Sequence, residues 1–478
     1  MSEKNDKQSR RKAKLKTERA FFNEIKKKGR EVNLLKAVQI LDKTITASLC
    51  ETVFQTTRTQ ERQRVWTLHA LVQFWNAVIV NAPTSLRQAL EEAAGGQSPQ
   101  WPEVETTAEA FFQRSQDLSW RFFEALYESY QNRIEKIAPP CFAQELAHVR
   151  SRFPEIRIVD ASSLDAIVHR LKILRHEEGT ILPGRIMAAY DLFRGHAASF
   201  RFSENAMESE IKQFGEILPQ IPRGALVVAD RLYGVAKAFG LLSPRGLYGL
   251  FRRHGSLSMR KIRRLNRKHL SDGVLEDWLV EAGTGQKGTE KQILRWVVLR
   301  RKKQGAYELL TNVLDPEQLS AEDALELYSQ RWDIERLFYD LKEVLHLHRF
   351  YAGNVNAVGM QVYAAVIVHT AMRLAQGRIA QQNGMAPEKI SIEKFFPRMA
   401  AALCRRHMMK FGAQMIKDSN PGVRLREPNW DRIKAGTVKL YQILVEPRQE
   451  GPPRKDTRVA KKKRNCISLH KLMSYSEN

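Results

Sequence analysis

The chain contains little cysteine and none of the common hydrolase motifs. Its cysteines are scattered and form no CxxC pair, which argues against a zinc ribbon or a disulfide framework and fits a reducing cytosol. It also lacks a Walker loop, a GxSxG elbow and an HExxH helix, so the usual nucleotide-hydrolysing, serine-hydrolase and zinc-hydrolase classes have no motif here. The cysteines are Cys50, Cys141, Cys404 and Cys466.

Long uninterrupted apolar runs are missing as well. The first residues are charged and contain no apolar signal core, so we expect a protein that is not exported. The longest apolar stretch, 357–374, contains Gln361, His369 and Arg373 and therefore predicts a buried helix, not a membrane span. We expect a cytoplasmic protein with no membrane partner.

Acidic residues are few relative to basic ones. The 53 Asp and Glu stand against 78 Lys and Arg, giving a formal charge of +25. This excess favours a polyanionic partner through phosphate contacts and counterion release, although a ribosome-associated or merely basic protein has the same charge. Within residues 1–30, the basic run predicts either a helix that touches DNA or a solvated arm.

The length of 478 residues suggests about three domains, and the pattern of apolar residues changes along the chain. Residues 31–94 predict two or three helices, and 105–137 predict one long amphipathic helix closed by Pro139-Pro140. Short apolar runs then end in Asp160 and Asp230, with strands and a helix between them, which indicates an α/β domain.

The segment Tyr328–Lys342, YSQRWDIERLFYDLK, carries four functional side chains at offsets of zero, three, seven and fourteen. In one continuous α-helix they fall within an arc of roughly 60°, beside the apolar face. Ser320 and Asp323 predict an N-cap and a first-turn acid just before it. The four residues, Tyr328, Arg331, Glu335 and Lys342, suit a site that holds a metal ion and a phosphate.

The two aspartates that end apolar runs are candidate metal ligands. A carboxylate at a strand end is accessible to a hard cation, and Mg²⁺ takes few carboxylates and completes its shell with water and phosphate oxygens. Asp160, Asp230 and Glu335 would form a two-metal phosphoryl-transfer site if the fold brings them together. The alternative is that each aspartate forms a turn or caps a helix, and Asp165 and Asp191 are nearby rivals.

This combination resembles the family-four insertion-sequence transposases of bacteria, which are DDE enzymes. The likeness covers about 150–375 and rests on the DRLYG context of Asp230 and on the Tyr-x2-Arg-x3-Glu-x6-Lys pattern that ends at Lys342. Leu232 departs from the family, in which many members have a small residue at that position. The resemblance implies an α/β fold with a ribonuclease-H-like (retroviral-integrase-like) core, a helical N-terminal domain and a helical C-terminal region.

The resemblance also assigns roles to residues. Asp160, Asp230 and Glu335 become the catalytic and metal-binding triad for Mg²⁺, with Mn²⁺ as a substitute. Tyr328, Arg331 and Lys342 become contacts to the DNA backbone. A β-rich basic insertion at about 245–304 adds DNA contacts at Arg252, Arg253 and Trp296, although Trp296 suits a core position as well as base stacking.

The expected domains are 1–150 for binding DNA ends, 151–380 for the catalytic core interrupted by 245–304, and 381–478 for dimerisation or DNA contact, with a basic tail. The expected function is Mg²⁺-dependent cut-and-paste excision and integration of an insertion sequence, through a hairpin intermediate, by a nucleoid-associated bacterial protein. The DNA partners are the element's terminal inverted repeats and target DNA, bound by a homodimer. Two alternatives stay open: a metal-dependent nuclease without strand transfer, and a domesticated, non-catalytic DNA-binding protein.

Overall fold

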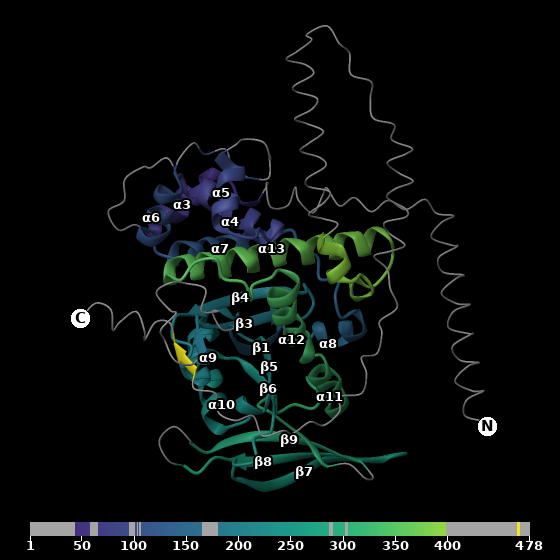
Figure 1. The fold of residues 1–478 in the computed structure, drawn as a ribbon. Coiled ribbons are helices and arrows are strands. Elements are labelled where there is room, and N and C mark those ends of the chain that lie inside the picture. Colours follow the sequence, from purple (N-terminus) through teal and green to yellow (C-terminus); the bar gives the residue numbers. More distant parts are fainter. Residues whose placement is uncertain are drawn as a thin grey trace, which may run out of the picture.

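The computed structural model describes residues 44–57, 66–94, 101–102, 104, 107–164, 180–285, 290–301, 305–397 and 466–468. The basic run within 1–30, the rival Asp165 and most of the C-terminal region lie outside these residues. In Figure 1 the described part forms stacked layers, with α-helices above the long helix α13 and a β-sheet below it.

One mixed sheet runs through the lower part of the molecule. Its strand order is β4-β3-β1-β5-β6-β10-β9-β8-β7, with β1, β5 and β6 parallel to one another and the other pairs antiparallel. The strands are β1 (Ile156–Ser163), β3 (Arg185–Asp191), β4 (His196–Ser203), β5 (Leu226–Ala229), β6 (Tyr248–Arg252), β7 (Met259–Leu270), β8 (Gly273–Ala282), β9 (Gln292–Arg301) and β10 (Tyr307–Thr311).

Helices cover both faces of the sheet. On one face, called here the α12 face, apolar residues of α12 and α13 share a core with Ile156 and Ile158. On the other, the α10 face, helices α9 and α10 pack against Val159 and Val227. Burial on both faces explains the unbroken apolar run of β5 and the apolar residues on either side of Arg157 in β1. The helices are α9 (Glu210–Ile217), α10 (Ala236–Leu242), α11 (Ala321–Ser329), α12 (Trp332–Tyr339) and α13 (Val355–Gln382).

The N-terminal helices dock on α13. The predicted single helix over 105–137 is wrong, because extended backbone at Leu118 ends α6 before α7 begins. Trp120, the N-cap of α7, stacks its ring on Tyr363 of α13 at 5.9 Å. The helices are α3 (Ala47–Thr57), α4 (Leu68–Asn81), α5 (Leu86–Ala94), α6 (Ala108–Asp117), α7 (Arg121–Ile134) and α8 (Ala147–Arg150).

Helix α13 contains the longest apolar stretch of the sequence. By length and composition it satisfies the criteria for a membrane span, but 89% of its most apolar window is buried inside the fold. Its neighbours are α4 and α7 on one side and β4 on the other. This arrangement is that of a core helix, as the polar residues in the stretch predict.

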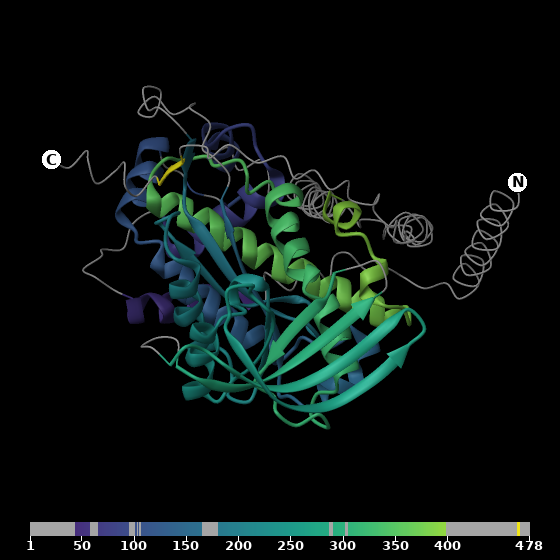
Figure 2. The same cartoon turned by 90° about the horizontal axis from the view of Figure 1, so that it is seen from below.

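The segment 245–304 is rich in strands, but its first part belongs to the centre of the sheet. Strand β6 pairs with β5 on one side and β10 on the other, so only β7, β8 and β9 extend beyond the parallel core. These three strands lie side by side at one end of the molecule (Figures 1 and 2). The C-terminal region contributes one described strand, β11 (Cys466–Ser468), which pairs in parallel with β2 (Thr180–Leu182).

Candidate active site at the carboxyl ends of the parallel strands

Asp160 and Asp230 lie at matching positions of adjacent parallel strands. The pairing of β1 with β5 runs from Ile156↔Leu226 to Ile158↔Val228, so the same register places Asp160 beside Asp230. Neighbouring strands are about 4.8 Å apart. Both aspartates have the parity of Ile158 and Val228, which face α12, so the two carboxylates project to the α12 face.

The Asp160 carboxylate is poorly solvated, with 19% of its side chain exposed. Burial raises its pKa to about 7, and the nearby Asp230 carboxylate acts in the same direction. The backbone N–H of Ala161, which donates to Asp160 Oδ1 at 2.8 Å, and the guanidinium of Arg331 oppose this rise. A buried carboxyl group with a raised pKa is typical of a site that functions with a cation.

Asp230 is both a turn former and a candidate ligand. It is the N-cap of the short 3₁₀ turn Arg231–Tyr233, and its Oδ1 accepts a hydrogen bond from the N–H of Leu232 at 2.7 Å. Gly234 follows where a Cβ would lie 1.9 Å from the carbonyl oxygen of Arg252, so a side chain there is excluded. The turn therefore fixes one carboxylate oxygen of Asp230 by a backbone contact.

Arg331, the residue before helix α12, links Glu335 of that helix to Asp160 at this edge of the sheet. The guanidinium of Arg331 lies 2.8 Å from Glu335 Oε1 and 3.8 Å from Asp160 Oδ2, and only 11% of this side chain is exposed. It therefore joins two members of the predicted triad. Its planar group also lies 4.5 Å over the ring of Trp332.

The helix that carries this motif is not continuous, contrary to the prediction. Helix α11 ends at Ser329, α12 begins at Trp332, and a π-helical turn, Asp340–Val344, follows directly. The π turn adds a residue to the helical repeat and rotates Lys342 toward the sheet. Lys342 Nζ there donates to the carbonyl oxygen of Ser163 at 2.8 Å. The predicted N-cap Ser320 is confirmed, since its side chain accepts from the N–H of Asp323.

Tyr328 is buried beside an aromatic residue that sequence reasoning did not single out. Its ring meets that of Tyr307 edge to face at 5.9 Å, and burial raises its pKa well above the usual range. The guanidinium of Arg252 lies 5.1 Å over the Tyr307 ring. Tyr307 begins β10, where strand alternation would have placed it on the α12 face, but its short run gave no separate signal.

Arg253 and Trp296 lie on the other face of the sheet. Trp296 is 8% exposed, and its Nε1 donates to Glu308 Oε2 at 3.0 Å. Arg253 forms an ion pair with the same carboxylate at 2.9 Å. These contacts are those of a packed sheet residue and its neighbours, and Trp296 lies on the face opposite Asp160, Asp230 and Glu335.

Of the two rival aspartates, Asp191 has a structural role. It pairs with Arg157 at the opposite end of β1, is 2% exposed, and accepts hydrogen bonds from the N–H groups of Phe193 and Arg194. Burial would raise its pKa, but Arg157, His196 and Arg194 together hold it below the usual value. Asp191 is therefore a turn former.

A fourth carboxylate lies near the two aspartates. Glu210, the first residue of α9, interacts electrostatically with Asp160 and Asp230 and forms an ion pair with Arg185 at 2.7 Å. Burial raises the pKa of Glu210, and Asp230 adds to this. The sequence did not predict the Glu210–Arg185 pair, because the pair depends on where the chain after β4 places the start of α9.

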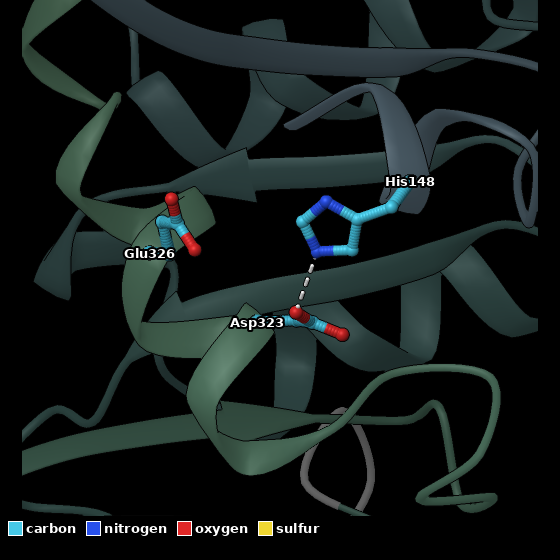
Figure 3. Close-up of side chains that lie close together, drawn as sticks. All are labelled: His148, Asp323 and Glu326. Atoms are coloured by element: carbon cyan, nitrogen blue, oxygen red, sulfur yellow. Dashed lines mark hydrogen bonds and ion pairs between the residues drawn. The ribbon is translucent and has the colours of Figure 1, made fainter. Parts of the chain in front are cut away.

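A separate group of possible metal ligands lies at the contact between α8 and α11. Figure 3 shows His148, Asp323 and Glu326 with their side chains close together. Asp323 already accepts from His148 Nε2 at 2.9 Å and from Arg152 Nη1 at 2.7 Å. Both carboxylate oxygens of Asp323 already interact with cationic or donor groups, so this cluster holds α8 against α11.

The residues at the strand ends fit a divalent cation. Asp160, Asp230 and Glu335 offer only oxygen donors, as hard cations require, and the Asp230 carboxylate adds to the rise that burial causes in the pKa of Asp160. In this structure Arg331 partly compensates that charge. A bound cation would take over this role and free the guanidinium for a phosphate group.

Comparison with known proteins shows that this part of the chain is similar to transposase domains. Residues 151–371, slightly under half of the chain, match the family model described as the transposase DDE domain. A transposase of insertion sequence element IS4SA from Synechocystis sp. is 34% identical over 96 residues, 19% of this chain and 27% of that relative. A transposase of insertion sequence element IS5377 from Geobacillus stearothermophilus is 28% identical over 127 residues, 26% and 33% of the two chains.

The chain thus spans a third or less of the length of these relatives. A solved synaptic complex of the piggyBac transposase with hairpin DNA aligns over 90% of this chain and 88% of that chain, at 11% identity and a TM-score of 0.37. That score is too low to decide the fold. Residues 151–371 are similar to the DDE domains of insertion-sequence transposases, and the candidate site lies within them.

Proposed function

We propose that this protein is a DNA transposase that excises and integrates an insertion sequence by phosphodiester hydrolysis and strand transfer. One observation carries the proposal. Asp160 and Asp230 each lie two residues beyond Ile158↔Val228, the last pair of the parallel β1–β5 register, and Arg331 links Asp160 to Glu335 of α12. The similarity of residues 151–371 to transposase DDE domains supports the same conclusion.

Within this proposal Asp160, Asp230 and Glu335 hold the divalent cation, with Mg²⁺ as the natural ion and Mn²⁺ as a substitute. The cation supplies Lewis-acid activation of the attacking and leaving oxygens. The carboxylates position it, and the buried surroundings of Asp160 exclude bulk water. Proton transfer from the nucleophile falls to solvent at the open side of the site, where Glu335 is 37% exposed.

Further residues bind DNA in this proposal. Arg331 grips a phosphate bidentately once the cation replaces it beside Asp160. Lys342 acts as a point charge next to Ser163, and Arg252 extends the positive surface beside Tyr307. Tyr328 belongs to the same set of proposed backbone contacts and, being buried, also shapes the wall of the site. Arg253 and Trp296, on the α10 face, contact DNA beyond the cleaved end.

We further assign the chain to the family-four group, with a ribonuclease-H-like core. The strand order β4-β3-β1-β5-β6, three antiparallel strands followed by two parallel ones with intervening helices, supports this core. The boundaries 1–150, 151–380 and 381–478 complete the proposal, with DNA ends bound by the first region. A hairpin intermediate, a homodimer that pairs two inverted ends, and association with the bacterial nucleoid also belong to it.

The test is Mg²⁺-dependent processing of a labelled duplex that carries the element's own end. The full chain should give nicked, hairpin and strand-transfer products, and Glu335→Ala should give none while binding the duplex with nearly unchanged affinity. Asp333→Ala is the matched control, because it removes a carboxylate from another face of the same helix. Full cleavage by Glu335→Ala would refute the triad.

The same experiment separates the two alternatives. Nicks without joined products would identify a metal-dependent nuclease. Tight binding to the correct end with no Mg²⁺-dependent cut would identify a DNA-binding relic of a transposase. In either case, the flanking DNA gives an independent check, since inverted repeats bracketed by short direct duplications accompany a mobile element.

A further inference from the structure

The outermost strand of the sheet, β7, has the sequence MRKIRRLNRKHL and is almost entirely exposed. It pairs only with β8 among the described residues and stands at the end of the sheet farthest from β4 (Figures 1 and 2). Its register with β8 is interrupted twice, at Ile262 and at Leu265. Each interruption is a β-bulge, in which two residues face one partner residue.

The two bulges decide which cations share a face. Strict alternation would place Lys261, Arg263, Leu265 and Arg267 together. Instead Lys261, Arg264 and Arg267 stand opposite Val280, Trp278 and Glu276, every second residue of β8. These partners are spaced by two residues, so the three cations follow one another at about 7 Å, roughly the axial rise of two nucleotides in one DNA strand.

This row, Lys261-Arg264-Arg267, lies on the α10 face. Val280 belongs to the core on that face, and Trp278 packs against it. Cations on the other face of β7 stand opposite Glu281, Leu279 and Leu275. The bulges therefore divide one basic strand into two rows that differ in their surroundings.

The row on the α10 face retains most of its positive charge. Within the described residues neither Lys261 nor Arg264 has a carboxylate at ion-pair distance; both lie over the Trp278 ring, at 4.3 and 5.6 Å from its centroid. Arg267 lies 3.8 Å from Glu276, but Arg300 shares that carboxylate at 3.6 Å. The ring orders the two cations without neutralising them.

The opposite row is more fully paired. Arg260 lies 3.4 Å from Glu281, and Lys268 lies 2.8 Å from Glu322 at the start of α11. Arg263 alone has no such partner among the described residues. The charge available to an external polyanion is therefore concentrated on the row beside Trp278.

We infer that the row Lys261-Arg264-Arg267 is a duplex-DNA contact that follows one phosphate backbone and reads no base sequence. The inference rests on the proposed function and adds a second place, away from the carboxylates, where DNA is held. The row ends at the edge of the sheet where Asp160 lies. Arg267 is close to the turn between β7 and β8, where Leu270 pairs with Gly273, and Gly273 pairs in turn with Arg301 at the end of β9. The row lies on the face of the sheet opposite the carboxylates, so a duplex gripped there would reach the cleavage site around this shared edge.

The test uses the full chain in EDTA with a 30-base-pair duplex of arbitrary sequence, and measures affinity by fluorescence anisotropy across a salt series. Lys261→Gln/Arg264→Gln/Arg267→Gln should weaken binding on the order of 100-fold at 0.1 M salt and lower the slope of log K against log salt by about 2 to 3. Arg260→Gln/Arg263→Gln/Lys268→Gln is the matched control, since it removes the same charge from the same strand. It should lower the slope by less than 1.

Equal losses in the two triple variants would overturn the inference, because only net charge would then matter. Unchanged binding in both, with aggregation, would also overturn it and assign the cations to protection of an edge strand. Glu276→Gln provides a variant whose expected effect is tighter DNA binding, which unfolding of the protein could not produce. It removes the one carboxylate of the row, frees Arg267 and Arg300, and should tighten binding several-fold.

Failure of the proposed function gives a different pattern. A chain that never cuts its own end in Mg²⁺ would still show the difference between the two rows in EDTA. A chain that cuts and joins DNA but binds equally through both rows would retain the proposed function and refute this inference.

Discussion

At the scale of single residues, the Asp160 carboxyl links stability to function. Its folded pKa of about 7 lies above its ordinary value of 3.8, so it stabilises the fold when protonated and loses that contribution as pH rises through 7. Asp160→Asn in EDTA should therefore be more stable than the parent at pH 8, by roughly 4 kcal/mol, and by less than half of that at pH 5. Thermal denaturation at the two pH values measures this, and a loss of stability at pH 8 would contradict it.

Arg331 contributes a second prediction, because it occupies the position of a cation. Its guanidinium bonds Glu335 and lies near Asp160, so it competes with a metal for the same oxygens. Arg331→Ala should bind Mn²⁺ more tightly without DNA, by about three- to tenfold, yet cleave DNA more slowly because a phosphate contact is lost. Calorimetric titration and single-turnover cleavage measure the two effects. Weaker Mn²⁺ binding would indicate that Arg331 only orders the carboxylates.

At the scale of secondary-structure elements, the π turn after α12 is held by a buried pair. Asp340, the first residue of this turn, is 4% exposed and lies 3.3 Å from His369 Nε2 of α13. Burial lowers the pKa of His369, which is therefore neutral at pH 7 and acts as a hydrogen-bond donor. The pair joins the turn that carries Lys342 to the core helix.

Removal of this pair should cost about 3 kcal/mol, since His369→Ala leaves the Asp340 carboxylate buried and unpaired. Urea denaturation measures the loss. The variant should also slow cleavage, but not further when Lys342→Ala is already present, because both act through the same turn. Gln376→Ala, elsewhere on α13, is the control that should destabilise without slowing cleavage by folded protein.

The motif helix also shows what the sequence could predict. The spacing of Tyr328, Arg331 and Glu335 predicted side chains for a phosphate and a cation, and the apolar runs located β5, which ends before Asp230, and β1, which continues past Asp160 to Ser163. The break before α12 and the π turn could not be predicted, because packing on α13 decides them. The Glu210–Arg185 pair and the two bulges of β7 likewise depend on how distant segments meet.

At the scale of the whole molecule, the N-terminal helices and the sheet share α13. Gly359 permits this docking, because a Cβ there would lie 2.6 Å from Cβ of Trp120. Gly359→Ala should destabilise the protein by about 1–3 kcal/mol through overpacking. Hydrogen exchange should rise in α7 more than in β1 and β5. Gly255→Ala is the control, since a Cβ there meets nothing within 4 Å.

The continuous sheet also sets the distance between the row Lys261-Arg264-Arg267 and Asp160. From β1, which carries Asp160, to β7 there are six inter-strand steps, through β5, β6, β10, β9 and β8. At about 4.8 Å each, these steps span roughly 29 Å, the rise of about eight or nine base pairs. The sheet would then serve as a ruler between the place where DNA is held and the place where it is cut. Duplexes trimmed to fewer base pairs beyond the cleaved bond should lose their dependence on Lys261, Arg264 and Arg267.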